Sequence, residues 1–349
     1  MTEIYLIRHG EAEGNVFRRI HGQYESLLTP RGHRQVKCVQ KRFENIHVDA
    51  CYSSDLTRTS LTARSIYIPK RLKLRRDPRF REVGLWEWED LPFGYLDKYE
   101  PHAMWAFNND PMHWTAPGAE TFDDYTQRFL EGMEEAARDH EGGTVAIFAH
   151  GAVIRGVLMR LFFGNDFSKL PYCDNTGVCK LTYHKGQFGY EFVNDNTHLP
   201  ETLSTFALQH WWRSTGNRKD VNFHYVPYES SMALPRGVQI PEMDSRGILL
   251  AAMLHDEPVA LVSLGAAEGD CGRILGMTLQ EGMDGRYYGD QLLGTAFSHF
   301  RNLGCRQLAV AEGFYPDDIV IRYEFDPQTR TRSIDPFAFD WDDAENDSK

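Results

Sequence analysis

Ile4-Tyr5-Leu6-Ile7-Arg8-His9-Gly10 is a short apolar run that ends in a cation, an imidazole and a glycine. Four apolar residues in a row predict a buried strand. At the end of that strand the arginine can neutralise an anion, the histidine can attack one, and the glycine lets backbone come close. The sequence therefore predicts an anion site where the first strand ends, provided that other segments supply partners.

The order strand, polar loop, helix repeats through the first 200 residues. We expect strands at 4–7, 50–53 and 144–149, with helices at 30–44, 56–66, 121–139 and 152–163. Thr29 precedes Pro30, a pair that predicts a helix start with Thr29 as the N-cap. This alternation favours a three-layer α/β/α domain around a parallel sheet. Because His9 and His150 each follow a predicted strand, and ligands bind at the carboxyl ends of such strands, we expect the two histidines to converge.

A different pattern begins near residue 221. Strands are expected at 248–254, 258–264, 273–278 and 307–311, with a helix at 289–303. We therefore divide the chain into a domain at 1–200, a connector at 201–220, a smaller α+β domain at 221–334 and an acidic tail at 335–349. Trp211-Trp212 is expected to dock the connector onto a domain.

Length, composition and charge limit the class of protein. A chain of 349 residues exceeds one typical domain, and 42% apolar with 25% charged residues is ordinary for a soluble globular protein. Residues 1–200 hold 25 basic and 27 acidic side chains (net −2), whereas residues 201–349 hold 13 and 23 (net −10). An acidic second half does not favour nucleic acid or anionic membranes as partners.

The expected location is the cytoplasm. No run of about 18 apolar residues predicts a membrane span, and the first strand begins too early for a secretory leader. The six cysteines lie far apart without a C-x-x-C pair, which is typical of reduced thiols in a cytoplasmic protein.

Residues 1–200 resemble the histidine phosphatase superfamily, which includes the cofactor-dependent phosphoglycerate mutases. The family's motifs occur here in the family's order. They are Arg8-His9-Gly10-Glu11 with Asn15, Gly22 ahead of Leu28-Thr29-Pro30-Arg31-Gly32, Ser53-Ser54-Asp55-Leu56-Thr57-Arg58-Thr59 with Thr62-Ala63, Arg81-Glu82, Pro117-Gly118-Ala119-Glu120, and His150-Gly151-Ala152-Val153-Ile154-Arg155.

The resemblance implies a role for each motif residue. His9 would attack phosphorus and form a phosphohistidine, which divides one difficult displacement into two easier ones. Arg8, Arg58 and His150 would surround the transferring group, whose charge spreads over three oxygens. Glu82 would protonate the leaving oxygen and later take a proton from water. Secondary contacts are expected from Asn15, Gly22 and Gly151.

These residues predict a phosphoric monoester hydrolase of the histidine acid phosphatase type, acting without a cofactor on a small phosphorylated metabolite. Two alternatives stay open. One is phosphoglycerate mutase-type transfer, although the mutases carry longer insertions around the acid-bearing loop than this chain does. The other is a silent module that only binds a phosphorylated ligand.

Three local ambiguities accompany this prediction. Glu87 and Glu89 lie close to Glu82 and compete for the acid's role. A metal could be bound by His9, His150 and Glu82, because their side chains are of types that bind metals. Two arginines aimed at the same point would repel a cation, so no metal is expected. The aromatic segment at 86–114 is either a lid over the site or a helical subdomain with an aromatic core.

The basic run at 70–81 also allows two interpretations. It is either a solvated strand face, with Leu72 and Leu74 pointing inward, or a rim that attracts a highly charged substrate.

Residues 221–325 resemble, more weakly, the Gcn5-related N-acetyltransferases. That family cradles the pyrophosphate of acetyl-CoA in a glycine-rich loop at a helix N-terminus. In this chain Asp284 stands where a basic or amide residue is expected, and Tyr287 stands where glycine permits close approach. We therefore expect a domain without acetyl transfer, which leaves dimerisation through this domain, docking and ligand sensing open, with residual coenzyme A binding as the alternative.

Overall fold

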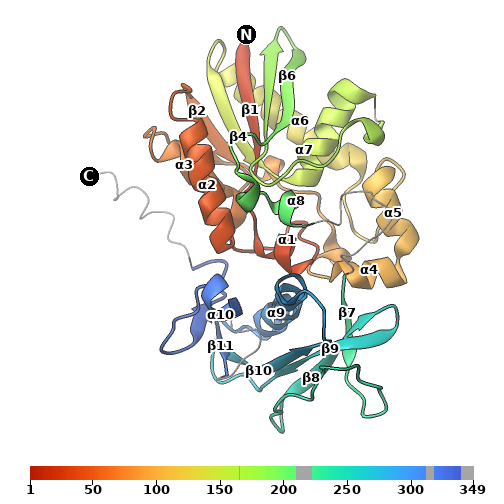
Figure 1. Ribbon diagram of the computed structural model, residues 1–349. Helices are drawn as coiled ribbons and strands as arrows, with labels where there is room; N and C mark the ends of the chain where they lie inside the picture. The colour runs from red at the N-terminus through yellow and green to blue at the C-terminus, as the bar shows by residue number, and fades with distance from the viewer. Residues whose placement is uncertain (165, 210–221, 312–317, 339–349) are drawn as a thin grey trace.

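Two six-stranded sheets form the framework of the molecule (Figure 1). The computed structural model describes residues 1–164, 166–209, 222–311 and 318–338. Within these residues each sheet carries its own helices, and the two units are stacked end to end. We call the part that contains the first sheet the first unit, and the part from residue 222 onward the second unit.

The first sheet has the strand order β3-β2-β4-β1-β5-β6. Its strands are β1 (Thr2–Arg8), β2 (Ala50–Ser53), β3 (Leu74–Arg76), β4 (Thr144–Ala149), β5 (Val178–His184) and β6 (Gln187–Asp195). Strands β1 to β4 are parallel, with Ile4 opposite Val145 and Arg8 opposite Ala149. The expectation of a parallel sheet was wrong at β5, which runs antiparallel to β1, and β6 in turn pairs antiparallel with β5. A two-residue turn joins them, and so short a connection permits only a reversal of direction.

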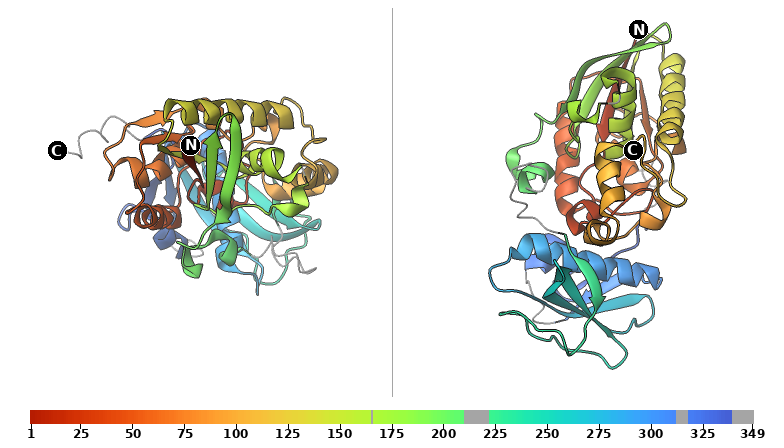
Figure 2. Two further views of the ribbon diagram at one scale, coloured as in Figure 1. Left: turned by 90° about the horizontal axis from the view of Figure 1, so that it is seen from above. Right: turned by 90° about the vertical axis from the view of Figure 1, so that its right-hand side faces the viewer.

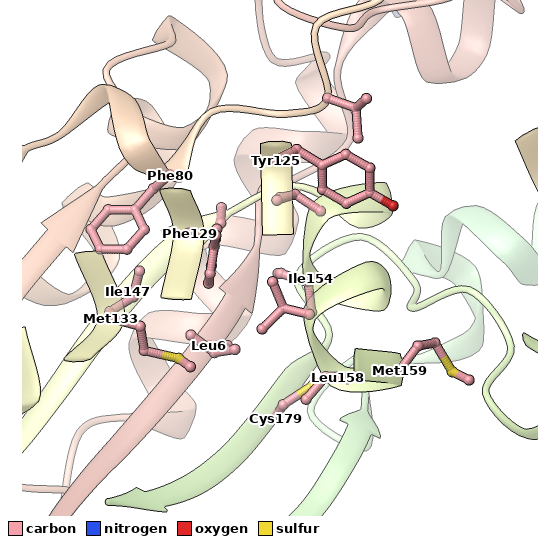
Figure 3. Close-up of a cluster of buried hydrophobic side chains, with 14 of the residues drawn as sticks. Leu6, Phe80, Tyr125, Phe129, Met133, Ile147, Ile154, Leu158, Met159 and Cys179 are labelled. Carbon is pink, nitrogen blue, oxygen red and sulfur yellow. The ribbon is translucent and has the colours of Figure 1, made fainter. Parts of the chain in front are cut away.

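Helices cover both faces of this sheet, which gives the three expected layers. The helices are α2 (Pro30–Arg42), α3 (Thr57–Tyr67), α6 (Phe122–Asp139) and α7 (Gly151–Leu158). Tyr5 and Ile7 of β1 point to the α2 and α3 side, whereas Ile4 and Leu6 point to the α6 and α7 side. Alternate residues of a strand face opposite sides, so both faces of β1 are apolar. Figure 3 shows part of the core between the sheet and helices α6 and α7, where Leu6 and Ile147 lie near Phe129, Met133 and Ile154.

The predicted helix starts are confirmed at their caps. The Thr29 side chain accepts a hydrogen bond from the backbone N–H of Gly32, and Thr121 forms a capping box with Asp124. Such caps satisfy N–H groups that have no partner inside the helix. Helix α7 continues beyond Leu158 as a π-helical turn at Met159–Phe163.

The aromatic segment at 86–114 contains α4 (Phe93–Tyr99) and α5 (Pro101–Asn109). Trp88 and Trp114 are buried and pack edge to face against each other and against Phe107. Trp86 and Trp105 are exposed. The expectation of an aromatic core is confirmed for the buried members, whereas a lid function stays a prediction.

The basic run at 70–81 forms mostly a solvated face. Leu72 and Leu74 pack partly buried against the core, and Lys73 and Arg75 between and beyond them are exposed. At the end of the run the charge of Arg81 is paired with that of Asp55.

The second sheet has the order β12-β11-β10-β9-β8-β7. Its elements are β7 (His224–Pro227), β8 (Ile248–Leu254), β9 (Glu257–Leu264), β10 (Cys271–Leu279), α9 (Gly285–Asn302), β11 (Gln307–Val310), α10 (Asp318–Arg322) and β12 (Thr331–Ser333). Strands β10 and β11 are parallel and joined through α9, and the other neighbours are antiparallel. The right-hand view of Figure 2 shows α9 between this sheet and the first unit.

The connector folds back onto the first unit. A 3₁₀ turn at Glu201–Leu203 and helix α8 (Thr205–Leu208) lie beside α2, where Gln35 donates to the carbonyl of Leu203. Trp211 and Trp212 lie outside the described residues, as do residues 339–349 of the expected acidic tail.

Candidate active site

His9 and His150 meet at the carboxyl edge of the first sheet. His9 directly follows β1, and His150 lies between β4 and α7 as the N-cap residue of that helix. Their ring centroids are 5.2 Å apart in an edge-to-face arrangement. Since β1 runs from the top of Figure 1 toward α9, this edge faces the second unit. The expected convergence of the two histidines is confirmed.

The His9 ring has a defined tautomer. Its Nδ1 lies 2.7 Å from the carbonyl oxygen of Gly10, which can only accept, so Nδ1 carries the proton. The lone pair is therefore on Nε2. Burial, reinforced by the positive charges of Arg58 and Arg8, holds the pKa of His9 well below its usual 6.5. A neutral imidazole with a free Nε2 is the form that can attack phosphorus.

His150 is fully buried, and neither ring nitrogen has a hydrogen-bond partner within the described part of the chain. Burial and the nearby Arg58 lower its pKa well below 6.5. Buried polar groups normally have partners, so an orphaned imidazole is a common feature of a ligand site. The ring is suited to bind an anionic ligand between itself and His9.

Arg58 comes from the second residue of α3 and is completely buried. Its two terminal nitrogens donate to the carbonyls of Gly22, at 2.7 Å, and Tyr24, at 2.8 Å. Burial lowers the pKa of Arg58, and the charges of Glu25 and Glu82 oppose that shift. An arginine stays charged even so, and the two carbonyls fix its direction.

Arg8 ends β1 and donates through Nη1 to the carbonyl of Cys173. Its Nε is buried without a partner among the described residues. Gly151 leaves space for this side chain, since a Cβ at that position would lie 3.0 Å from the Arg8 Nε. The structure thus supplies a steric reason for a glycine at position 151. The sequence had predicted only a contact through the backbone N–H of Gly151.

Glu82 is held at the start of α7. Its Oε1 accepts from the backbone N–H of Val153 at 2.8 Å, and its Oε2 accepts from that of Ala152 at 3.1 Å. The carboxylate therefore reaches the helix that His150 caps. Of its two competitors, Glu87 is exposed, and Glu89 is engaged by the N–H groups of Gln23 and Leu85. Glu82 also accepts from backbone N–H groups, so what favours it for the acid's role is its contact with the helix that His150 caps.

Asn15 and Gly22 shape the loop between β1 and α2. The Asn15 Oδ1 accepts from Ala12 N–H at the start of α1 (Glu13–Phe17). Gly22 has a positive φ of 51°, and a Cβ there would lie 2.4 Å from a carboxylate oxygen of Glu89. Its carbonyl is an acceptor for Arg58, so Gly22 acts in this structure by positioning the arginine.

Two further residues beside His9, His21 and Asn175, were missed from the sequence, and Thr62 of the Arg58 motif also lies here. His21 lies with its ring centroid 6.2 Å from that of His9. Asn175 donates to the His9 carbonyl, and the Thr62 hydroxyl accepts from Gly10 N–H. Burial and the charges of Arg58 and Arg8 lower the His21 pKa well below 6.5. The position of His21 next to Gly22 was a usable signal, whereas nothing in the spacing indicates Asn175.

A family model described as the histidine phosphatase superfamily (branch 1) matches residues 4–196, more than half of the chain. The chain belongs to the histidine phosphatase superfamily. A metal-independent phosphoserine phosphatase of Arabidopsis thaliana is 31% identical over 176 residues, which cover 49% of this chain and 73% of that protein. A probable phosphoglycerate mutase of Serratia proteamaculans is 30% identical, covering 47% and 76%. The solved structure of Bacillus stearothermophilus YhfR superposes with a TM-score of 0.54 at 31% identity, covering 57% of this chain and 99% of that one.

These relatives support the expected class of histidine phosphatase, an enzyme that hydrolyses phosphomonoesters through a phosphohistidine. The family model ends at residue 196, so it leaves the acetyltransferase resemblance of the second unit unsupported. Among the described residues there is no group of three His, Cys, Asp or Glu side chains placed to hold a metal ion, and no helix long and apolar enough to span a membrane.

Proposed function

We propose that this histidine phosphatase hydrolyses a small phosphorylated metabolite, with His9 as the nucleophile and Glu82 as the acid and base. The observation that carries the proposal is the bond between the Nδ1 of His9 and the Gly10 carbonyl. This bond leaves Nε2 unprotonated beside an unpartnered His150 and two arginines. Phosphoryl transfer depends mainly on such positioning and on charge stabilisation.

In the first step the Nε2 of His9 forms a bond to phosphorus while the bond from phosphorus to the substrate oxygen breaks. The leaving oxygen keeps the electron pair and takes a proton from Glu82. Oε2 is suited to carry this proton, because it accepts one bond, from Ala152, and retains a second lone pair. The first product is an alcohol.

In the second step a water oxygen attacks phosphorus and gives its proton to the Glu82 carboxylate. The bond between nitrogen and phosphorus breaks, and its electron pair returns to Nε2 of His9. Inorganic phosphate leaves, and the enzyme regains its starting state. Arg8, Arg58 and His150 bind the phosphoryl oxygens in both steps. This is the chemistry of the histidine acid phosphatase type.

A quench experiment tests the nucleophile directly. A ³²P-labelled phosphomonoester is mixed with wild-type protein and with His9→Ala, and protein-bound phosphate is counted after denaturation. We expect acid-labile label on the wild type alone. No label and no turnover in the wild type would contradict the proposal.

A substrate panel follows the quench experiment. Phosphoserine, sugar phosphates, nucleotides and p-nitrophenyl phosphate are ranked as substrates by the phosphate that the enzyme releases from each.

Mutase activity is the second candidate, and the resemblance to a probable phosphoglycerate mutase favours testing it. A mutase returns the phosphoryl group from histidine to a second hydroxyl, whereas a phosphatase gives it to water. Incubation with 3-phosphoglycerate separates the two, since a mutase forms 2-phosphoglycerate and a phosphatase releases phosphate.

For the second unit we propose an α+β domain without acetyl transfer. The Asp284 side chain caps α9 by accepting from Arg286 N–H at 2.9 Å, so the helix N-terminus already has a carboxylate. A carboxylate at this point repels a pyrophosphate. Isothermal titration with acetyl-CoA tests this, and micromolar affinity would contradict it.

A homodimer formed through the second unit stays a prediction. Sedimentation equilibrium measures whether the protein is a dimer.

A further inference from the structure

Helix α1 is shared between the two units. It lies in the loop that follows His9, yet its residues Val16 and Phe17 are buried in the core of the second unit. The Phe17 ring packs against Phe297, with centroids 5.1 Å apart, and against Tyr323 at 5.5 Å. Helix α9 approaches so closely that a Cβ on Gly294 would lie 2.3 Å from the Phe17 Cβ.

A buried ion pair fixes the start of α1. Nη1 of Arg301, on α9, lies 2.8 Å from Oε2 of Glu13, and the two side chains are 9% and 2% exposed. The same oxygen accepts from the backbone N–H of Leu27, at the other end of the loop. Arg301 is itself held through Nε by the Ile334 carbonyl. Nη2 of Arg332 also lies 3.9 Å from Oε1 of Glu13, so both cations beside this buried carboxylate come from the second unit. A buried carboxylate left without cations is strongly unfavourable, so Glu13 depends on the second unit.

From α1 the contacts continue to His9. The backbone N–H of Gly14 donates to the Nε2 of His21, whose ring packs near His9. On the other side of α1, Asn175 donates both to the Asn15 Oδ1 and to the His9 carbonyl. A displacement of α1 would therefore reach His9 from two directions.

The second unit also contacts other segments next to the candidate active site. Thr57, the residue before Arg58, donates its hydroxyl to the carbonyl of Pro336 at 3.1 Å. Arg19 binds Asp90, beyond the Glu82 loop, and Ser298 of α9 at 2.8 Å. The second unit thus contacts the loop that follows His9 and the start of the helix that carries Arg58, and through Arg19 it also reaches the Asp90 segment.

We propose that the second unit is a structural part of the phosphatase site, and that Arg301, through its ion pair with Glu13, is a positioning residue for His9. The inference rests on the proposed function. Arg301 touches no reacting atom in this role. It holds α1, and α1 in turn contacts the His21 ring beside His9 and, through Asn175, the His9 backbone. In-line attack depends on this placement of His9.

A positioning role predicts a specific kinetic pattern. The phosphate-binding groups Arg8 and Arg58 come from β1 and α3, so binding should change little. The position of His9 relative to phosphorus should become less accurate. Errors of about 1 Å in placement can lower the rate on the order of 100-fold. We therefore expect Arg301→Gln to lower kcat at least about tenfold while KM changes less than about threefold.

The experiment uses the full chain with p-nitrophenyl phosphate, at a temperature where circular dichroism shows each variant to be folded. Glu13→Gln is the second variant, because glutamine keeps an oxygen for Leu27 N–H while it removes the charge and replaces the other oxygen by an NH2 group. Arg306→Gln is the control in the second unit, since that side chain is 74% exposed. The double variant of Glu13 and Arg301 completes a mutant cycle.

Support requires a lower kcat per folded molecule in both single variants, an unchanged control, and a loss in the double variant smaller than the product of the single losses. An unchanged kcat per folded molecule in Glu13→Gln overturns the positioning role, even where Arg301→Gln does not fold. Losses that multiply in the double variant, or an equal loss in the control, overturn it as well. The quench assay on the wild type keeps the two ideas apart, because absence of phosphohistidine there defeats the proposed function itself.

Discussion

The imidazole rings of His9 and His150 lie edge to face with their centroids 5.2 Å apart, at the ends of two neighbouring parallel strands. The two rings differ in their partners. His9 is tied through Nδ1 to the Gly10 carbonyl, whereas His150 has no hydrogen-bond partner among the described residues. One ring is thereby fixed in orientation, and the nitrogens of the other are available to a ligand.

The loss of rate in Glu82→Gln should depend on the leaving group, if Glu82 is the acid. An alkyl oxygen needs a proton as it leaves, whereas p-nitrophenolate does not. General acid catalysis contributes about 10²- to 10⁴-fold, so kcat for an alkyl phosphate should fall by that order and kcat for p-nitrophenyl phosphate by less than about tenfold. Steady-state kinetics on both substrates measure the difference.

The matched control is Glu87→Gln, because Glu87 lies nearby but is exposed. It should leave both rates unchanged. Equal slowing of the two substrates in Glu82→Gln would remove Glu82 from the acid's role.

Arg58→Lys should lower kcat/KM although the positive charge remains. The guanidinium binds the Gly22 and Tyr24 carbonyls with two nitrogens, and an ammonium cannot keep that fork-like geometry while also binding a phosphoryl oxygen. Loss of one oriented donor costs about 10²- to 10³-fold in catalytic rate. Arg34→Lys, at an exposed position of α2, serves as the control. A loss below about threefold in Arg58→Lys would show that charge alone suffices.

Stability should fall in acid, because burial lowers the pKa values of His9, His21 and His150 well below 6.5. Between pH 6.5 and the lower folded-state values, the unfolded chain binds protons that the folded chain does not. The free energy of unfolding therefore declines as pH falls through this window, by up to about 1.4 kcal/mol per pH unit for each histidine.

His150→Gln removes one of these protons. The slope of unfolding free energy against pH, from urea titrations between pH 5 and 7, should become shallower by about one proton, or about 1.4 kcal/mol per pH unit. Parallel profiles for the wild type and the variant would mean that His150 is protonated equally in both states.

Gly14→Ala should disturb the site through His21. A Cβ at position 14 would lie 2.3 Å from the His21 Nε2, so the ring must move. Overpacking of this kind costs about 1–3 kcal/mol, and we expect a loss of stability together with a lower kcat.

His21→Ala provides the matched background for that substitution. With the ring removed, alanine at a helical position should stabilise by up to about 1 kcal/mol relative to glycine. Denaturant unfolding of the four combinations measures the sign. A destabilising Gly14→Ala in the His21→Ala background would point to a different clash.

Much of the first unit could be predicted from local patterns. The strand at 144–149 and the N-caps Thr29 and Thr121 follow from apolar runs and capping residues, which act within a few positions of the chain. The direction of β5 and β6 was less accessible. Their Lys185-Gly186 turn, with two positive φ angles, indicates a hairpin, but the antiparallel pairing of β5 with β1 depends on contacts distant in sequence.

The sequence by itself determined which groups are present and where they stand: two histidines and two arginines, each beside the end of a strand or the start of a helix. Only the tertiary structure decided how these groups are held. No local pattern indicates that Phe17 belongs to the core of the second unit, or that Glu13 is paired with Arg301. The reason is physical, since a buried charge or ring needs a partner in space, and many residues of this chain could have supplied one.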